Sequence, residues 1–153
     1  MAAYFMDSSA AAKRHVAETG SAWVRAITNI GAGNWIYVAR ITAVEVVAAL
    51  ARRQRAGSLT AAELGLALAE WRAAVEKEFL VEEVTAPVLD RAMLLAEKYA
   101  LRGYDAVQLA AALITNEERL VRKLPALVLV SADEELNAAA AAEGLVVENP
   151  NTH

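Results

Sequence analysis

The chain has 153 residues, of which 57% are hydrophobic and 6% aromatic, so it can bury a sizeable core built mainly from Ala, Val and Leu. The absence of cysteine excludes disulfides, thiolate metal sites and cysteine nucleophiles, and two histidines are too few for a His-rich zinc site. The net charge of −4 argues against a protein that wraps nucleic acid with its whole surface, although it allows a local basic patch. With no membrane-length apolar run and no signal-peptide pattern, we expect a cytoplasmic protein with one domain over residues 1–150.

Hydrophobic periodicity and helix-capping residues divide the chain into short strands that alternate with helices. In chain order we expect a strand at 2–6, helices at 10–13 and 18–30, a strand at 35–39, helices at 42–55 and 60–77, a strand at 79–84, helices at 85–99 and from 107 to before Pro125, a strand at 126–130, a helix at 134–142 and a strand at 145–148. Such alternation predicts an α/β fold with a central parallel sheet between two layers of helices.

The helix that begins near Val107 is apolar on most of its surface, because its apolar residues recur at the spacing of a core-facing stripe and Leu109 and Leu113 widen that stripe. It should therefore be buried on most sides. Asp105 lies just before it, at a helix start that should face the carboxyl edge of the sheet.

Four acids share one kind of position, at the end of a predicted strand or in the first turn of a predicted helix. They are Asp7, Glu45, Asp105 and Asp133. Ligands of parallel α/β sheets bind at the carboxyl ends of the strands, where these acids would meet. Carboxylates without His or Cys suit a hard cation such as Mg²⁺ or Mn²⁺. With one or two such ions the acids could hold a water and a phosphate for in-line displacement; without them they would repel one another.

Each acid also has a structural interpretation. Asp105 and Asp133 could simply cap helices, and Glu45 could complete a capping box opened by Thr42. Asp7 is different, because an acid that ends a buried strand needs a partner.

Other polar residues are predicted to be mainly structural. Ser8 and Ser9 have no neighbouring base and are interpreted as helix caps, and His15 is expected at the surface. The cluster of Arg52, Arg53 and Arg55 could grip a phosphate backbone or could equally be a solvated helix end.

Taken in order, the motifs around these acids resemble the PIN-domain family, specifically the toxins of VapBC-type toxin–antitoxin pairs. The matching pieces are Tyr4-Phe-Met-Asp7-Ser-Ser9, Thr42-Ala-Val-Glu45, Leu101-Arg-Gly-Tyr-Asp105-Ala-Val-Gln-Leu-Ala-Ala, Leu129-Val-Ser131-Ala-Asp133-x-x-Leu136 and Gly144-Leu-x-Val-x-Asn149-Pro150. The resemblance covers essentially the whole chain and implies a Rossmann-like sheet.

The resemblance also implies an Mg²⁺- or Mn²⁺-dependent endoribonuclease. Asp7 and Asp105 would be the primary metal ligands, Glu45 and Asp133 would complete the site, and Ser131 would assist through its hydroxyl. A metal-activated water would cleave an RNA phosphodiester, leaving a 5′-phosphate and a 3′-hydroxyl. Weak RNA contacts would come from a rim of arginines, namely Arg52, Arg53, Arg55 and Arg102.

The expected partners are an RNA substrate, a cognate antitoxin that blocks the cleft and a second copy of the chain in a homodimer. The alternative is a catalytically inactive PIN-fold module that acts only through protein interactions.

Overall fold

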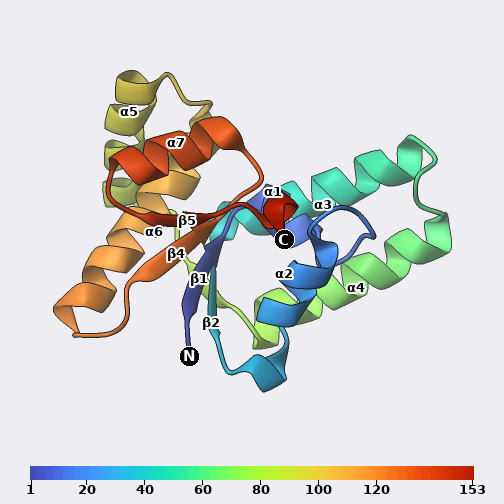
Figure 1. Cartoon of the computed structure of the whole chain (residues 1–153). Helices are drawn as coiled ribbons and strands as arrows, with labels where there is room; N and C mark the ends of the chain where they lie inside the picture. Colours follow the sequence, from blue (N-terminus) through green and yellow to red (C-terminus); the bar gives the residue numbers. More distant parts are fainter.

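A computed structural model describes residues 1–153 and shows one five-stranded parallel sheet with helices on both faces (Figure 1). The strands are β1 (Ala3–Met6), β2 (Trp35–Ala39), β3 (Leu80–Glu82), β4 (Leu127–Val130) and β5 (Val146–Glu148), in the spatial order β3-β2-β1-β4-β5. The helices are α1 (Ser8–Ala12), α2 (Ser21–Ile27), α3 (Arg40–Arg55), α4 (Ala61–Lys77), α5 (Ala86–Tyr99), α6 (Gly103–Val121) and α7 (Glu134–Ala142), with 3₁₀ turns η1 (Ile30–Ala32) and η2 (Pro150–Thr152). β1 is central, so the residue that follows it lies in the middle of the carboxyl edge.

Side chains that alternate along the strands build two separate cores, one on each face of the sheet. Phe5 and Leu129 pack with α5, α6 and α7, whereas Met6 and Val130 pack with α1 to α4 on the opposite face. Figure 1 shows the two groups of helices on either side of the sheet. The predicted α/β fold with three layers and a parallel sheet is therefore confirmed.

Three helices begin earlier than the sequence predicted. α1 starts at Ser8 rather than at residue 10. α3 starts at Arg40 rather than at Thr42, because the chain turns into the helix directly after β2. α6 starts at Gly103, so Asp105 lies inside its first turn. The helix predicted over 18–30 is shorter, since α2 spans Ser21–Ile27 and the chain then forms the 3₁₀ turn η1. None of the helices has the length and apolar character needed to cross a bilayer.

The start of α2 is packed tightly against the C-terminal turn η2, and Gly20 makes this packing possible. Gly20 has a φ of 83°, and a Cβ there would lie 2.3 Å from the carbonyl oxygen of Pro150. We expect Gly20→Ala to lower the free energy of unfolding by about 3 kcal/mol, since left-handed strain and overpacking add. Urea unfolding measures this change.

Gly65→Ala is the matched control for that experiment. Gly65 lies within α4, where a Cβ would meet nothing within 4 Å. The substitution should therefore stabilise the protein by up to ~1 kcal/mol through helix propensity. If both substitutions changed the free energy of unfolding equally, the close approach of Gly20 to Pro150 would not be what restricts this position.

Candidate active site at the carboxyl edge of the sheet

Asp7 lies at the middle of the carboxyl edge, directly after β1. The parallel register pairs Met6 with Val130, so Asp7 comes next to Ser131 at the end of β4. The Asp7 amide donates to the Val130 carbonyl at 3.2 Å, which extends the strand pairing to the acid itself. Asp7 is also the N-cap of α1, since its Oδ1 accepts from the Ala10 amide at 2.9 Å. This acid therefore serves as both strand end and helix cap.

The Asp7 carboxylate is buried and surrounded by hydroxyl donors. Ser131 Oγ donates to Oδ2 at 2.7 Å, and Ser9 Oγ contacts both carboxylate oxygens at 2.7 and 2.9 Å. Burial raises the pKa of Asp7 from 3.8 to about 6, although the bonds from Ser131, Ala10 and Ser9 oppose this rise. The Asp7 side chain is consequently held in place by three donors at an electrostatic cost.

We expect Ser131→Ala to raise the pKa of Asp7 by about one pH unit, because the bond from Ser131 favours the charged carboxylate. Carbon-13 NMR titration of the carboxyl groups measures the shift. Ser8→Ala is the matched control, because Ser8 donates to Glu45 and makes no bond to Asp7. An unchanged Asp7 titration in Ser131→Ala would show that the hydroxyl does not tune this acid.

Glu45 lies on α3 and faces α6 rather than the start of its own helix. Its Oε1 accepts from Gln108 Nε2 at 2.8 Å, and its Oε2 accepts from Ser8 Oγ at 3.3 Å. Thr42 is fully buried and exchanges hydrogen bonds with the Gln108 amide. The predicted capping box of Thr42 and Glu45 is therefore wrong, because α3 begins at Arg40 and turns both side chains toward α6.

Asp105 lies in the first turn of α6, three residues before Gln108 on the same face of the helix. It is half-buried, and its pKa is raised by burial first and then by the negative charges of Asp133 and Glu45. Asp105 is not the N-cap of α6, because that position belongs to Arg102. The acid thus belongs to an electrostatically coupled group of carboxylates.

Asp133 follows β4 and is the N-cap of α7, as its interpretation as a cap predicted. Its Oδ1 accepts from the Leu136 amide at 2.9 Å. Its own amide donates to Ser131 Oγ at 3.0 Å, which links it to the hydroxyl that holds Asp7. The cap contact uses one carboxylate oxygen, and the negative charge still acts on Asp105.

The donor chemistry of these four acids fits a hard divalent cation. The four acids offer oxygen ligands alone. The charges of Asp133 and Glu45, which add to burial in raising the pKa of Asp105, repel this acid, and a bound cation relieves such repulsion. No group of three or more acidic or histidine side chains is close enough to hold a metal in this conformation. The acids are neighbours across four elements, and cation binding requires some of their side chains to turn inward.

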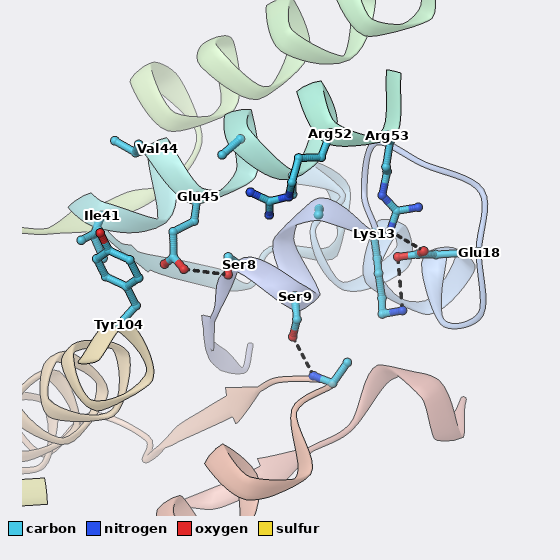
Figure 2. Close-up of a pocket in the computed structure, with 14 residues that line it drawn as sticks. Ser8, Ser9, Lys13, Glu18, Ile41, Val44, Glu45, Arg52, Arg53 and Tyr104 are labelled. Carbon is cyan, nitrogen blue, oxygen red and sulfur yellow. Dashed lines mark hydrogen bonds and ion pairs between the residues drawn. The ribbon is translucent and has the colours of Figure 1, made fainter. Parts of the chain in front are cut away.

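A cavity of about 640 Å³ opens beside the acids, between α1, α3 and the start of α6 (Figure 2). Glu45 and Ser8 line its middle, Tyr104 lies near Ile41 at one end, and Arg52 and Arg53 lie toward the other. Of the arginines predicted to form an RNA rim, Arg52 and Arg53 line this cavity. Arg55 is in the last turn of α3 outside the lining, and Arg102 precedes α6, where its charge lowers the pKa of Asp105.

Sequence reasoning missed three residues that organise the site. Ser9 joins β1 to β4, because its Oγ accepts from the Ala132 amide at 2.9 Å while contacting Asp7. Gln108 joins α6 to α3 through Glu45. Tyr104 lines the cavity beside Asp105. The spacing of Asp105 and Gln108, three residues apart on one helix, was the only signal in the sequence that pointed to any of these contacts.

Comparisons with known proteins identify the family of the chain. Residues 4–142 match the family described as PIN domain. The chain is 35% identical over 144 residues to Ribonuclease VapC45 and to Ribonuclease VapC49 of Mycobacterium tuberculosis, covering 92% of this chain and 90% of each relative.

Two solved structures share the fold at low identity. One is PAE2754 from Pyrobaculum aerophilum, with a TM-score of 0.62, 23% identity and coverage of 95% of this chain and 89% of that one. The other is a toxin–antitoxin complex from Klebsiella pneumoniae, with a TM-score of 0.59, 15% identity and coverage of 96% and 97%. With a family match over most of its length and VapC relatives at this identity, the chain belongs to the PIN-domain family and is VapC-like within it.

Proposed function

We propose that the chain is an endoribonuclease, the toxin of a toxin–antitoxin pair, and that it hydrolyses RNA phosphodiesters with the help of Mg²⁺ or Mn²⁺. The observation that carries this proposal is the grouping of four carboxylates from four separate elements at one edge of the sheet, where burial and then the charges of Asp133 and Glu45 raise the pKa of Asp105. The ribonuclease names of the two VapC relatives support the reaction class.

The proposed roles are those that the family resemblance implies for each side chain. Asp7 and Asp105 hold the cation, while Glu45 and Asp133 complete the site directly or through water. Ser131 holds the Asp7 carboxylate in place through its 2.7 Å bond. When bound, the cation supplies positive charge that polarises the phosphodiester and makes a water more acidic. Gln108 keeps Glu45 turned toward the site.

The proposed partners are an RNA substrate, an antitoxin and a second copy of the chain. The toxin–antitoxin complex among the solved relatives is in line with an antitoxin partner. Leu89 and Met93, one turn apart on α5, are exposed and offer an apolar surface for pairing. Arg52, Arg53, Arg55 and Arg102 contribute weak, salt-sensitive contacts to RNA, and the proposed location is the cytoplasm.

The test is metal-dependent cleavage of labelled single-stranded RNA by purified chain that is free of antitoxin. Cleavage should need Mn²⁺ or Mg²⁺, stop with EDTA and return with excess metal. Glu45→Gln protein, prepared by the same route, controls for contaminating nucleases. Cleavage that persists in EDTA, or that Glu45→Gln retains in full, would contradict the proposal. If no RNA is cut, calorimetry with Mn²⁺ shows whether the acids bind a cation; a protein that binds none is not this enzyme.

A further inference from the structure

The cavity has two chemically different ends, and Glu45, the one of the four acids that lines it, lies between them. Figure 2 shows Tyr104 near Ile41 at one end, Glu45 and Ser8 in the middle, and Arg52 further along α3. We propose that this cavity is a two-point binding site for single-stranded RNA: a nucleobase stacks on Tyr104, and a phosphate on the other side of Glu45 binds Arg52. This inference rests on the proposed function and adds the residues that position the strand.

The aromatic end is built to receive a flat apolar group. Tyr104 is in the first turn of α6, directly before Asp105, and 60% of its surface is exposed. At the same end of the cavity Val44, which is 69% exposed, and Ile41 present apolar side chains from α3. Exposed aromatic rings beside a phosphate-binding site are the usual stacking platform for unpaired bases. A base held there would place its phosphate next to the acids.

The basic end is set by the spacing of one face of α3. Glu45, Ala48, Ala49 and Arg52 follow one another at intervals of three, one and three residues, and all four line the cavity. Seven residues of helix place Arg52 ~10 Å beyond Glu45 along the axis. The two alanines between them have short side chains that do not obstruct the cavity, so an RNA strand can pass from Glu45 to the Arg52 guanidinium.

Arg52 is the cation of this cavity that remains available to a phosphate. Arg53 Nη2 contacts Glu18 Oε2 at 2.7 Å, and Lys13 Nζ contacts Glu18 Oε1 at 3.4 Å, so both of these charges already have a carboxylate partner. Arg52 is exposed and takes part in none of the ion pairs of the chain. An exposed ring and a free guanidinium on opposite sides of Glu45 fit a single-stranded polyanion better than a protein segment.

The first measurement is fluorescence anisotropy of a short labelled single-stranded RNA of mixed sequence. Asp7→Asn protein serves as the background, because binding can then be followed with Mg²⁺ present and without cleavage. In this background Tyr104→Ala should raise the Kd about tenfold or more, whereas Tyr104→Phe should bind like the parent because it keeps the ring. RNAs that carry 2-aminopurine at one position at a time should show quenching at a single position, which Tyr104→Ala removes and Tyr104→Phe retains.

The second measurement is the salt dependence of the same binding. Arg52→Gln should reduce the slope of log K against log salt by ~0.7, the value for one lost phosphate contact on a single strand. Arg122→Gln is the matched control. Arg122 is exposed at the far end of the 19-residue helix α6, ~28 Å from its start, and should leave the slope unchanged.

The proposal is overturned if Tyr104→Ala binds RNA like the parent, if no position is quenched, or if Arg52→Gln leaves the slope unchanged. A cavity that receives a protein segment instead of RNA would give these results. Thermal unfolding of each variant confirms that it is folded, which the exposure of both side chains leads us to expect. Effects of Tyr104 and Arg52 on binding, together with a wild-type chain that cuts no RNA, would uphold the binding site and refute the proposed nuclease activity.

Discussion

Asp105→Asn protein is expected to cleave RNA about a thousandfold more slowly than the wild-type chain, or not at all. Burial and then the charges of Asp133 and Glu45 raise the pKa of Asp105, so it belongs to the group of acids that a cation would neutralise. Removing one charge from such a group weakens cation binding and forfeits several kcal/mol of charge stabilisation in the transition state. Single-turnover cleavage of labelled RNA at saturating Mn²⁺ measures the loss.

The same substitution separates an enzyme from an inactive interaction module. Asp90→Asn is the matched control, because Asp90 is an exposed acid on α5, away from the site, and its loss should leave cleavage unchanged. An interaction module would cut no RNA with any of the three chains, and Asp105→Asn would still bind its antitoxin. Full activity in Asp105→Asn would refute the proposed role of the four acids.

The architecture could be predicted because the three central strands β1, β2 and β4 are largely buried and several helices start at a recognisable cap. The apolar run that ends at Val130 is only four residues long as a strand, yet its flanking Pro125 and Ser131 bound it closely in the sequence. The helix expected from residue 60 begins at a Thr-x-x-Glu pattern, and Thr60 and Glu63 form a capping box with both reciprocal hydrogen bonds. These signals are local, so they can be recognised in the sequence without knowledge of the tertiary structure.

The contacts that organise the site could not be predicted because they join residues far apart in the sequence. Ser9 was interpreted as a cap, but its hydroxyl contacts Asp7 and the Ala132 amide, 123 residues away. Glu45 was compatible with a local capping box until the packing of α3 on α6 turned it toward Gln108, 63 residues away. A capping-box pattern such as Thr-x-x-Glu also occurs by chance in a sequence. Tertiary contacts then decide which hydrogen-bond partner each side chain has.

His15 shows the same limit outside the site. It was expected at the surface, but its side chain is fully buried and packs edge-on against Trp71, with ring centroids 5.7 Å apart. Burial lowers its pKa, and its Nε2 has no hydrogen-bond partner. Nothing in the residues next to His15 indicates this, because Trp71 comes from α4 and reaches it only in the folded protein.

Asp7→Asn should make the metal-free protein more stable at pH 7.5 by about 3 kcal/mol. Asp7 has a pKa of about 6 in the folded protein and 3.8 as its ordinary value, so the folded state binds this proton more tightly than the unfolded state. The folded state is therefore favoured below pH 3.8, and the advantage is lost as the pH rises through 6. Above pH 6 the charged carboxylate costs about 1.4 kcal/mol for each unit of the difference.

Asparagine avoids that cost while it keeps the local hydrogen bonds. Its oxygen can accept from the Ala10 amide and Ser9, and its amide can donate to Ser131, which acts as the donor to Asp7 in the wild-type chain. Urea unfolding in EDTA at pH 7.5 and pH 5 measures the gain, which should shrink at the lower pH because most wild-type Asp7 is then protonated. Added Mn²⁺ should stabilise the wild-type chain, because the cation binds the Asp7 carboxylate in the folded state. It should leave the stability of Asp7→Asn nearly unchanged. Cation binding would also explain why a buried carboxylate is retained at this energetic cost. A variant that is less stable than wild type at pH 7.5, or that gains as much from Mn²⁺, would show that Asp7 is a structural cap and not a ligand.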